Sequence, residues 1–188
     1  MDSKRLVRVS KFLSLHLRHQ PADLGLTLEP GGWVPVADLL AGAACAGFRV
    51  TPDELIEIVR SSDKQRFAFD PTGTKIRANQ GHSAKVDLQL EATEPPAELY
   101  HGTAAPALDA IRAEGLKKMA RHHVHLSPDT ATAARVGSRH GRLVVLSVDA
   151  AAMHDAGHVF FRSVNGVWLV DAVPPEYLRF IESPGTPP

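Results

Sequence analysis

A polar segment from Gln89 to Glu98 divides the sequence into two stretches with different patterns. The segment contains acids, a threonine and the pair Pro95-Pro96, a composition typical of a linker. Helical periodicity dominates before this segment, and short apolar runs bounded by turn residues dominate after it. A chain of 188 residues is long enough for two small domains. We therefore expect one lobe over residues 1–90 and a second lobe over residues 95–182.

The first lobe is predicted to combine helices with a small sheet. An apolar side chain recurs every three or four residues along residues 3–19, and Thr51-Pro52-Asp53-Glu54 is a capping box that begins another helix. The expected elements are helices over 3–19, 36–46 and 52–61, short strands at 27–28 and 33–34, and a hairpin that joins 66–69 to 74–77. This order resembles a winged-helix module, and the resemblance favours contact with nucleic acid.

The second lobe is predicted to be richer in strands. Asn165-Gly166 lies between two apolar runs, which indicates a tight hairpin. The expected strands cover 99–101, 124–126, 143–148, 159–163, 167–170 and 178–181, and the expected helices cover 106–114 and 128–136. The sequence therefore predicts an α+β fold in which the sheet of the second lobe is mostly antiparallel.

Positive charge is distributed unevenly, although the formal net charge is zero. Residues 1–20 hold five Lys or Arg against one acid, and residues 112–142 hold seven against two, with four histidines besides. Arginine outnumbers lysine 14 to 7. The arginine bias fits bidentate binding of phosphate, and it fits genomic base composition equally well. The zero net charge argues against a protein that coats nucleic acid nonspecifically.

Several classes of protein are excluded by what the sequence lacks. No apolar run approaches the ~20 residues that span a bilayer, and no apolar stretch follows the basic residues near Met1, so we expect no membrane partner and a cytoplasmic location. The single cysteine, Cys45, cannot form an internal disulfide. The glycine-rich motifs of Rossmann and P-loop nucleotide sites are missing, as is the nucleophile motif of α/β-hydrolases.

Histidines 122, 123 and 125 form the most obvious metal candidate. Zinc needs three or four ligands, and these usually include a second segment of Cys or His at ordered spacing. Cys45 stands alone and carboxylates near the histidines are few. Strand alternation would place His123 and His125 on one face, which suits a pocket as well as a metal. We expect no metal site.

Four short segments combine arginine, histidine and small polar residues. Arg18-His19 ends the first predicted helix, where cations also complement the helix dipole. The helix dipole alone does not account for three further segments of similar composition. They are Ser62-Asp63-Lys64-Gln65-Arg66-Phe67, Tyr100-His101-Gly102-Thr103 and Val136-Gly137-Ser138-Arg139-His140-Gly141.

Together these segments resemble the NAD-dependent RNA 2′-phosphotransferase family, which removes the 2′-phosphate left at tRNA splice junctions. Further matches run through residues 76–83, through Val124-His125-Leu126-Ser127 and through Ser163-Val164-Asn165-Gly166-Val167-Trp168-Leu169. The resemblance covers about residue 5 to residue 181 in order. Each motif is weak alone, but their common order across the chain is specific.

The resemblance implies an RNA-binding, winged-helix-like first lobe and an ADP-ribosyltransferase-like second lobe that binds NAD as co-substrate. The family's catalytic arginines and histidine fall on Arg18, His19, Arg66 and Arg139. The residues implied to contact NAD are His101, Gly102, Thr103, His125, Leu126 and Ser127. Residues 167–170 lack the glutamate that other ADP-ribosyltransferases carry on a late strand, so ordinary protein ADP-ribosylation is not expected.

In the family's reaction, the 2′-phosphate attacks the nicotinamide ribose and nicotinamide leaves. The 2″-hydroxyl then attacks phosphorus, giving ADP-ribose 1″,2″-cyclic phosphate and RNA with a free 2′-hydroxyl. Arginine forks suit the charge on phosphate, and a histidine of near-neutral pKa suits proton transfer.

Two alternatives remain open. An enzyme that stops after the first step would cap nucleic-acid phosphate ends with ADP-ribose, and a non-catalytic nucleic-acid-binding module would need only the first lobe. We expect RNA bearing a 2′-phosphate and NAD as partners, no metal, and a monomer.

Overall fold

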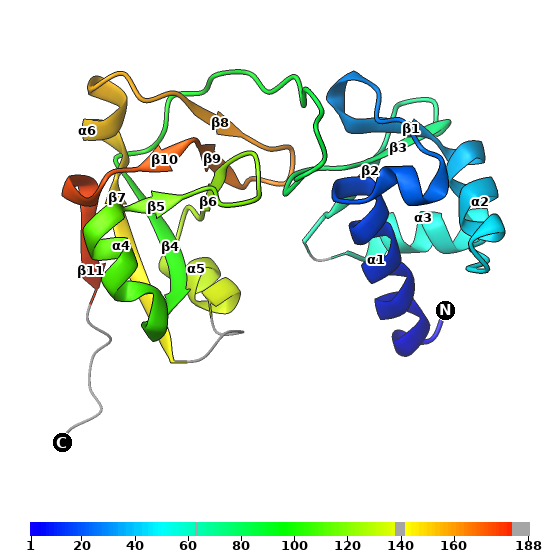
Figure 1. Cartoon of the computed structure of the whole chain (residues 1–188), viewed down its shortest axis with the longest axis horizontal. Coiled ribbons are helices and arrows are strands. Elements are labelled where there is room, and N and C mark those ends of the chain that lie inside the picture. Colours follow the sequence, from blue (N-terminus) through cyan, green and yellow to red (C-terminus); the bar gives the residue numbers. More distant parts are fainter. Residues whose placement is uncertain (63, 138–141, 182–188) are drawn as a thin grey trace. The chain divides into compact units, whose positions relative to one another are not determined.

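The computed structural model describes residues 1–62, 64–137 and 142–181. The chain forms two compact units, Met1–Leu90 (unit 1) and Glu91–Pro188 (unit 2), and each unit has its own hydrophobic core (Figure 1). Within the described ranges, no helix is both long and apolar enough to cross a membrane. The mixed α/β composition with antiparallel sheets agrees with the predicted fold class.

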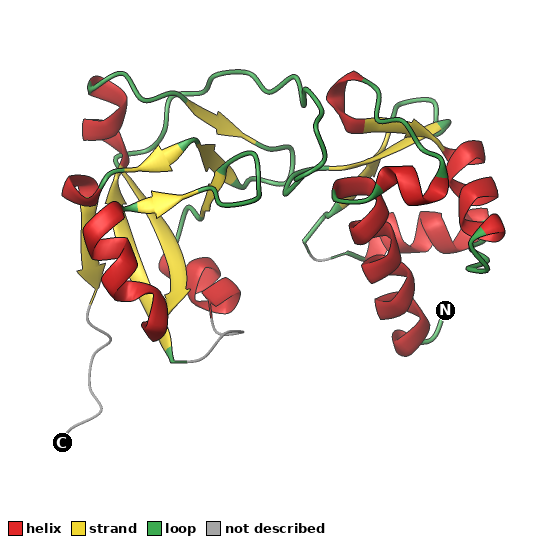
Figure 2. Cartoon of the chain, viewed as in Figure 1, coloured by secondary structure: helices red, strands yellow, loops and turns green. Residues whose placement is uncertain are grey.

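Unit 1 packs helices against a small antiparallel sheet with the strand order β1-β3-β2 (Figure 2). The predicted helices and the predicted hairpin are confirmed to within two residues at each end. The helices are α1 (Ser3–Arg18), α2 (Val36–Cys45) and α3 (Pro52–Ser61), with 3-10 turns at Pro21–Leu24 and Pro30–Gly32, and the strands are β1 (Trp33–Pro35), β2 (Phe67–Phe69) and β3 (Lys75–Ala78).

The prediction of a strand at residues 27–28 is wrong. The predicted pairing across the 29–32 turn is reduced to a single bridge between Glu29 and Trp33. Gly31 and Gly32 both have positive φ and belong to a 3-10 turn, so the chain does not return alongside itself. The hydrogen-bonding partner of β1 is β3, which lies about 40 residues later in the sequence.

An ion pair joins α1 to α3. The Nε of Arg5 donates to Oε1 of Glu54 at 2.8 Å and the Nη2 donates to Oε2 at 3.0 Å. The same glutamate closes the capping box of α3, where it accepts from the backbone N of Thr51 at 3.0 Å. Arg5 holds the pKa of Glu54 below its ordinary value. The carboxylate of Glu54 therefore both caps the start of α3 and fixes the packing of α3 against α1.

Unit 2 contains antiparallel sheets with the strand orders β11-β7-β4, β6-β9-β8 and β10-β5 (Figure 1). Its strands are β4 (Glu98–Ala104), β5 (Leu116–Lys117), β6 (Val124–Leu126), β7 (Leu143–Asp149), β8 (Phe160–Arg162), β9 (Trp168–Val170), β10 (Ala172–Val173) and β11 (Leu178–Ile181). Its helices are α4 (Leu108–Glu114), α5 (Thr130–Gly137) and α6 (Ala150–Asp155), with 3-10 turns at Ala105–Ala107 and Pro175–Tyr177.

The predicted strands of unit 2 are confirmed, and three short elements were missed. Strands β6 and β11 have the predicted bounds, and the Asn165-Gly166 turn connects β8 to β9. Gly166 has φ +78° in that turn. The short elements α6, β5 and β10 gave no recognisable periodicity. Helix α5 begins at Thr130, two residues later than predicted, because the carboxylate of Asp129 accepts from the backbone N of Thr132 at 2.7 Å.

A pair of glycines lets α5 pack directly on β4. A Cβ built on Gly102 would lie 1.9 Å from the carbonyl oxygen of Ala133, and one built on Gly137 would lie 2.7 Å from the carbonyl carbon of Gly102. The helix backbone therefore occupies the space that a side chain at residue 102 would fill. Helix–strand packing alone is sufficient to require glycine at this position, independently of any approach by a dinucleotide.

We predict that Gly102→Ala destabilises unit 2 by about 3 kcal/mol or more, because the clash is between backbone atoms and no rotamer change can relieve it. Gly157→Ala is a matched control, since nothing lies within 4 Å of the position that its Cβ would take and only a φ of +91° opposes the substitution. That control should lose about 1–2 kcal/mol. Urea unfolding of both variants measures the difference, and equal losses would contradict the packing argument.

Candidate functional site

The C-terminal end of α1 is fixed by a segment that follows the last strand of the sheet in unit 1. The carbonyl oxygen of Arg18 accepts from the backbone N–H of Ser83 at 3.0 Å and of Ala84 at 2.9 Å. Carbonyls in the last turn of a helix lack helical partners, so these two bonds satisfy a group that would otherwise need water. The Nδ1 of His19 lies 2.8 Å from Oγ of Ser83. The exposed imidazole is thus held by the segment that caps its helix.

The guanidinium of Arg18 packs against two features of the same unit. Its Cζ lies 5.8 Å from the ring centroid of Phe67, at the start of β2. Its Nη1 lies 3.6 Å from the position that a Cβ on Gly81 would occupy. Because Gly81 has φ +88°, it both allows the turn into Ser83 and leaves room for the arginine.

Arg66 is positioned by backbone contacts on both sides. Gln65 has φ +40°, and its carbonyl accepts from Nδ2 of Asn79 at 2.5 Å. The backbone N of Asn79 then donates to the carbonyl of Arg66 at 2.9 Å, which extends the β2–β3 ladder by one residue. Asn79 is buried, so its role here is to bond this loop.

Three of the four predicted catalytic residues, Arg18, His19 and Arg66, belong to unit 1. Arg18 and His19 are consecutive, and Arg18 contacts the residue that follows Arg66. No ion pair in the described ranges includes Arg66. The fourth predicted residue, Arg139, lies outside the described residues.

The predicted NAD residues of unit 2 meet where β4 pairs with the chain after β6. The backbone N of Tyr100 donates to the carbonyl of Ser127 at 2.9 Å, and the N of Ser127 donates to the carbonyl of Tyr100 at 2.7 Å. Beside this bridge, Nδ1 of His101 donates to the carbonyl of His125 at 3.0 Å. Backbone pairing thus places His101, His125 and Ser127 at one point of the unit.

The environment of His101 favours the neutral imidazole. Burial lowers its pKa below the ordinary value, the bond to the carbonyl of His125 opposes that shift, and the charge of Arg121 adds to it. Because Nδ1 carries the proton in this bond, Nε2 of the neutral ring is an acceptor. The Nη1 of Arg121 lies 3.3 Å from Nδ1 of His125. We missed Arg121 from the sequence, where its only signal was membership of the basic stretch 112–142.

The remaining predicted contacts differ in what they can offer a ligand. Leu126 is buried and packs in the core of unit 2, which leaves its backbone as the part able to contact a ligand. Thr103 is partly buried on β4, opposite Val144 of β7. One side of Gly102 is covered by the backbone of α5.

The histidine-rich segment does not gather metal ligands. The ring of His123 packs edge-on against Phe161, with 5.4 Å between centroids, and burial lowers its pKa. Among the residues that the structure describes, no group of three or more His, Cys, Asp or Glu side chains is placed to hold a metal ion.

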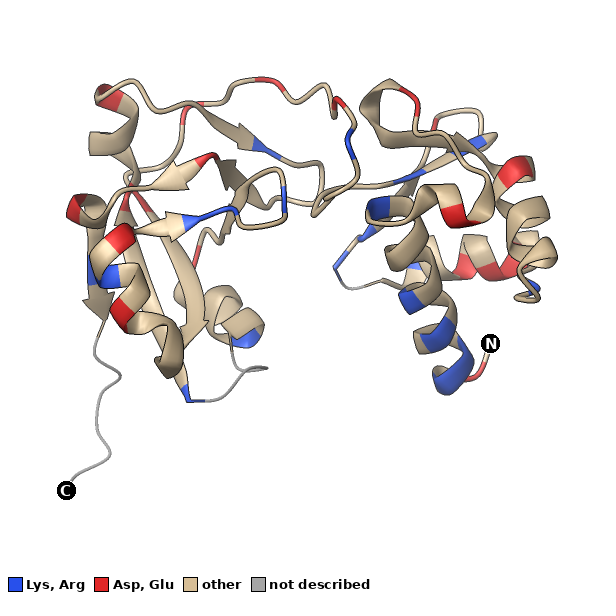
Figure 3. Cartoon of the chain, viewed as in Figure 1, with Lys and Arg blue, Asp and Glu red and all other residues tan. Residues whose placement is uncertain are grey.

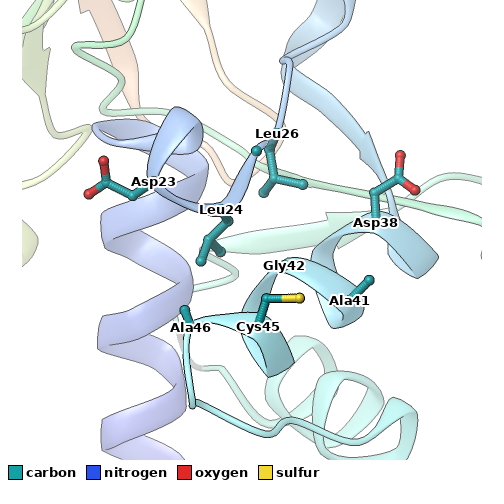
Figure 4. A pocket seen from close by; sticks show the side chains of 9 residues that line it. Asp23, Leu24, Leu26, Asp38, Ala41, Gly42, Cys45 and Ala46 are labelled. Carbon is teal, nitrogen blue, oxygen red and sulfur yellow. The ribbon is translucent and has the colours of Figure 1, made fainter.

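A pocket of about 570 Å³ lies elsewhere in unit 1, between the 3-10 turn after α1 and helix α2 (Figure 4). It includes none of the predicted site residues. Its lining is mostly small or apolar, with two carboxylates: Asp23, Leu24, Gly25, Leu26, Asp38, Ala41, Gly42, Cys45 and Ala46. Gly42 packs so closely on the Leu24 carbonyl that an added Cβ would lie 2.4 Å from the oxygen. The pocket therefore marks a tight helix contact and offers no group suited to phosphate chemistry.

Comparison with known proteins gives a consistent match over nearly the whole chain. Residues 4–172 match the model of the RNA 2′-phosphotransferase, Tpt1/KptA family. A probable RNA 2′-phosphotransferase of Nostoc punctiforme is 59% identical over 181 residues, which cover 96% of this chain and 100% of the relative. One from Streptomyces griseus is 59% identical over 185 residues (95% and 98%), and one from Herpetosiphon aurantiacus is 58% identical over 178 residues (95% and 98%).

The partly buried His101 predicts that unit 2 loses stability in mild acid. Since its folded pKa is lowered, the unfolded chain takes up a proton near pH 6.5 that the folded unit resists, so stability falls as the pH drops through about 6.5 toward the folded pKa. His101→Gln should remove part of this pH dependence, whereas His154→Gln, at an exposed position, should not. Unfolding curves between about pH 5 and 8 measure it, and an NMR titration midpoint of His101 above about 6.5 would refute the assignment.

Proposed function

The chain belongs to the RNA 2′-phosphotransferase family, and from this membership we propose that it transfers an internal RNA 2′-phosphate to NAD⁺. The products of this reaction are RNA with a free 2′-hydroxyl, ADP-ribose 1″,2″-cyclic phosphate and nicotinamide. The observation that supports the proposal is the end of α1, where Arg18 and His19 are consecutive, the imidazole lies 2.8 Å from Ser83 Oγ and the Arg18 guanidinium contacts Phe67, the residue after Arg66. This set provides two planar forks for a phosphate dianion and one imidazole for proton transfer.

The first step forms a bond between a 2′-phosphate oxygen and the anomeric carbon of the nicotinamide ribose. The glycosidic bond to the nicotinamide ring breaks, and its electron pair neutralises the cationic ring as it leaves. The nucleophile is already ionised, so this step needs the phosphate to be held in place more than it needs an acid. In our proposal, the forks of Arg18, Arg66 and Arg139 hold the phosphate.

The second step forms a bond between the ribose 2″-oxygen and phosphorus, and it breaks the bond from phosphorus to the RNA 2′-oxygen. One proton leaves the attacking hydroxyl and one arrives at the departing oxygen. We assign this transfer to His19, whose ring is held at 2.8 Å from Ser83 Oγ. The arginine forks stabilise the charge that accumulates around phosphorus.

Unit 2 is proposed to bind the dinucleotide around His101, His125 and Ser127. The neutral His101 has its Nδ1 proton committed to the carbonyl of His125, so Nε2 is suited to accept a hydrogen bond from a ribose hydroxyl. Arg121, beside His125, is suited to a diphosphate oxygen. NAD⁺ supplies the ribosyl group and the nicotinamide leaving group when bound.

The proposed activity predicts three products from one incubation. With NAD⁺ and a short RNA that carries one internal 2′-phosphate, we expect nicotinamide, the cyclic phosphate and an RNA about 80 Da lighter, identified by mass spectrometry. The same RNA without the 2′-phosphate is the control and should release no nicotinamide. A stable ADP-ribosylated RNA as the final product would instead indicate an enzyme that caps phosphate ends.

The two steps should respond differently to substitution. His19→Ala should slow loss of the intermediate more than its formation, so that ADP-ribosylated RNA accumulates. Arg66→Lys keeps the charge but loses the planar fork, and it should slow turnover by about 10²-fold. Arg60→Lys on α3 is the matched control and should leave both steps unchanged. If His19→Ala blocks nicotinamide release with no intermediate visible in a quenched time course, His19 serves the first step and our assignment fails.

A further inference from the structure

The outward face of α1 carries a stripe of positive charge. Lys4, Arg8 and Lys11 are all exposed and are spaced four and three residues apart, which places them on one side of the helix. Val9 and Leu13 on the opposite side are fully buried. The helical repeat continues this stripe to Arg18, the last residue of α1. Figure 3 shows several basic positions along this helix. We call Lys4, Arg8 and Lys11 the α1 stripe.

No ion pair that the structure describes in unit 1 compensates the charge of the α1 stripe. Helix α1 contains no acidic residue, and its first turn, where the helix dipole favours acids, carries Lys4 and Arg5 instead. Arg5 is neutralised by Glu54, but no ion pair in the described ranges includes a residue of the α1 stripe. Like charges four residues apart on a helix repel each other and weaken the helix. This arrangement is unfavourable for the helix alone and favourable when a polyanion lies along it.

The charge on α3 argues against this helix as the surface that binds RNA. In helix-turn-helix readers, the second helix of the motif enters the groove of the nucleic acid, and α3 would hold that place in unit 1. However, α3 carries Asp53, Glu54 and Glu57 against a single cation, Arg60. Of these, Glu57 pairs with the N-terminal ammonium group and Asp53 is exposed. A phosphate backbone would be repelled there and attracted to α1.

We propose that the α1 stripe binds the phosphodiester backbone of the RNA strand whose 2′-phosphate is held at Arg18. This inference rests on the proposed function, because it takes the end of α1 as the reacting site. From Lys4 to Arg18 the helix rises about 21 Å, a length that accommodates several consecutive nucleotides. Leu15, 42% exposed, lies between Lys11 and Arg18 on the same side and provides an apolar contact for a sugar.

The test compares substrates of different length. We expect the triple variant K4A/R8A/K11A to lose about 10²-fold in kcat/KM at about 50 mM salt on a decamer with one 2′-phosphate, through KM rather than kcat. The loss should be far smaller on a dinucleotide carrying the same 2′-phosphate. The slope of log binding constant against log salt concentration, measured with the decamer, should become less steep by about 2, or about 0.7 per lost phosphate contact. The double variant K4A/K11A, which keeps the contact of Arg8 with Phe48, should show about two thirds of that change in slope.

The control variant R60A/K117A/R179A removes the same number of charges at exposed positions off the α1 stripe, and it should bind the decamer as the unsubstituted chain does. Equal losses in both triple variants would mean that net charge alone attracts RNA, and the proposal would be overturned. Unchanged decamer binding in K4A/R8A/K11A, with loss only of binding to phosphatidylserine vesicles, would assign the stripe to membranes and overturn it too. If the unsubstituted chain turns over neither substrate, the proposed function fails, whereas turnover without length dependence refutes only the stripe.

Discussion

The site in unit 1 depends on one backbone contact, the carbonyl of Arg18 accepting from Ser83 and Ala84. These bonds end α1 and bring a segment 65 residues away in sequence against its last turn. Since they are made by backbone atoms, they set the position of Arg18 and His19 without depending on either side chain. The turn that makes them possible needs a positive φ at Gly81, and the missing side chain there also leaves space for the Arg18 guanidinium.

In unit 2, as in unit 1, backbone hydrogen bonds position the side chains that we propose to bind a ligand. The mutual backbone bonds of Tyr100 and Ser127 align β4 with the chain after β6, and that alignment presents the carbonyl of His125 to His101. Burial then keeps the imidazole neutral. A neutral acceptor suits a ribose hydroxyl and does not repel a cationic nicotinamide ring, whereas the fixed cations of unit 1 suit a phosphate dianion. The two units therefore differ in electrostatics as our assignment of ligands requires.

Sequence reasoning succeeded where the physical signal is local. The capping box at Thr51 and the Asn165-Gly166 turn determine their elements through neighbouring residues, and both predictions are confirmed. Predictions failed where the partner is distant in sequence. Strand β1 pairs with β3 rather than with residues 27–28, and the close packing of α5 is what requires glycine at residue 102. For the same reason sequence reasoning could not find Ser83 beside His19 or Arg121 beside His125. The named folds of the two lobes and the catalytic roles stay predictions.

Charge placement on α1 explains why Arg5 is ion-paired while no ion pair among the described residues includes the α1 stripe. Arg5 lies about 100° around the helix from Lys4, on the flank that meets α3, and there it forms a bidentate pair with Glu54. That pair is only partly exposed and adds to the packing of α1 on α3, so the helix stays anchored although its outer face is repulsive. Neutralising the outer face with acids at the same spacing would stabilise the helix and at the same time cancel the positive potential that leads to Arg18. Helix stability and attraction of a phosphate backbone thus place opposite demands on the same positions, and in α1 the ion pair of Arg5 with Glu54 lies on the inner flank, away from the α1 stripe.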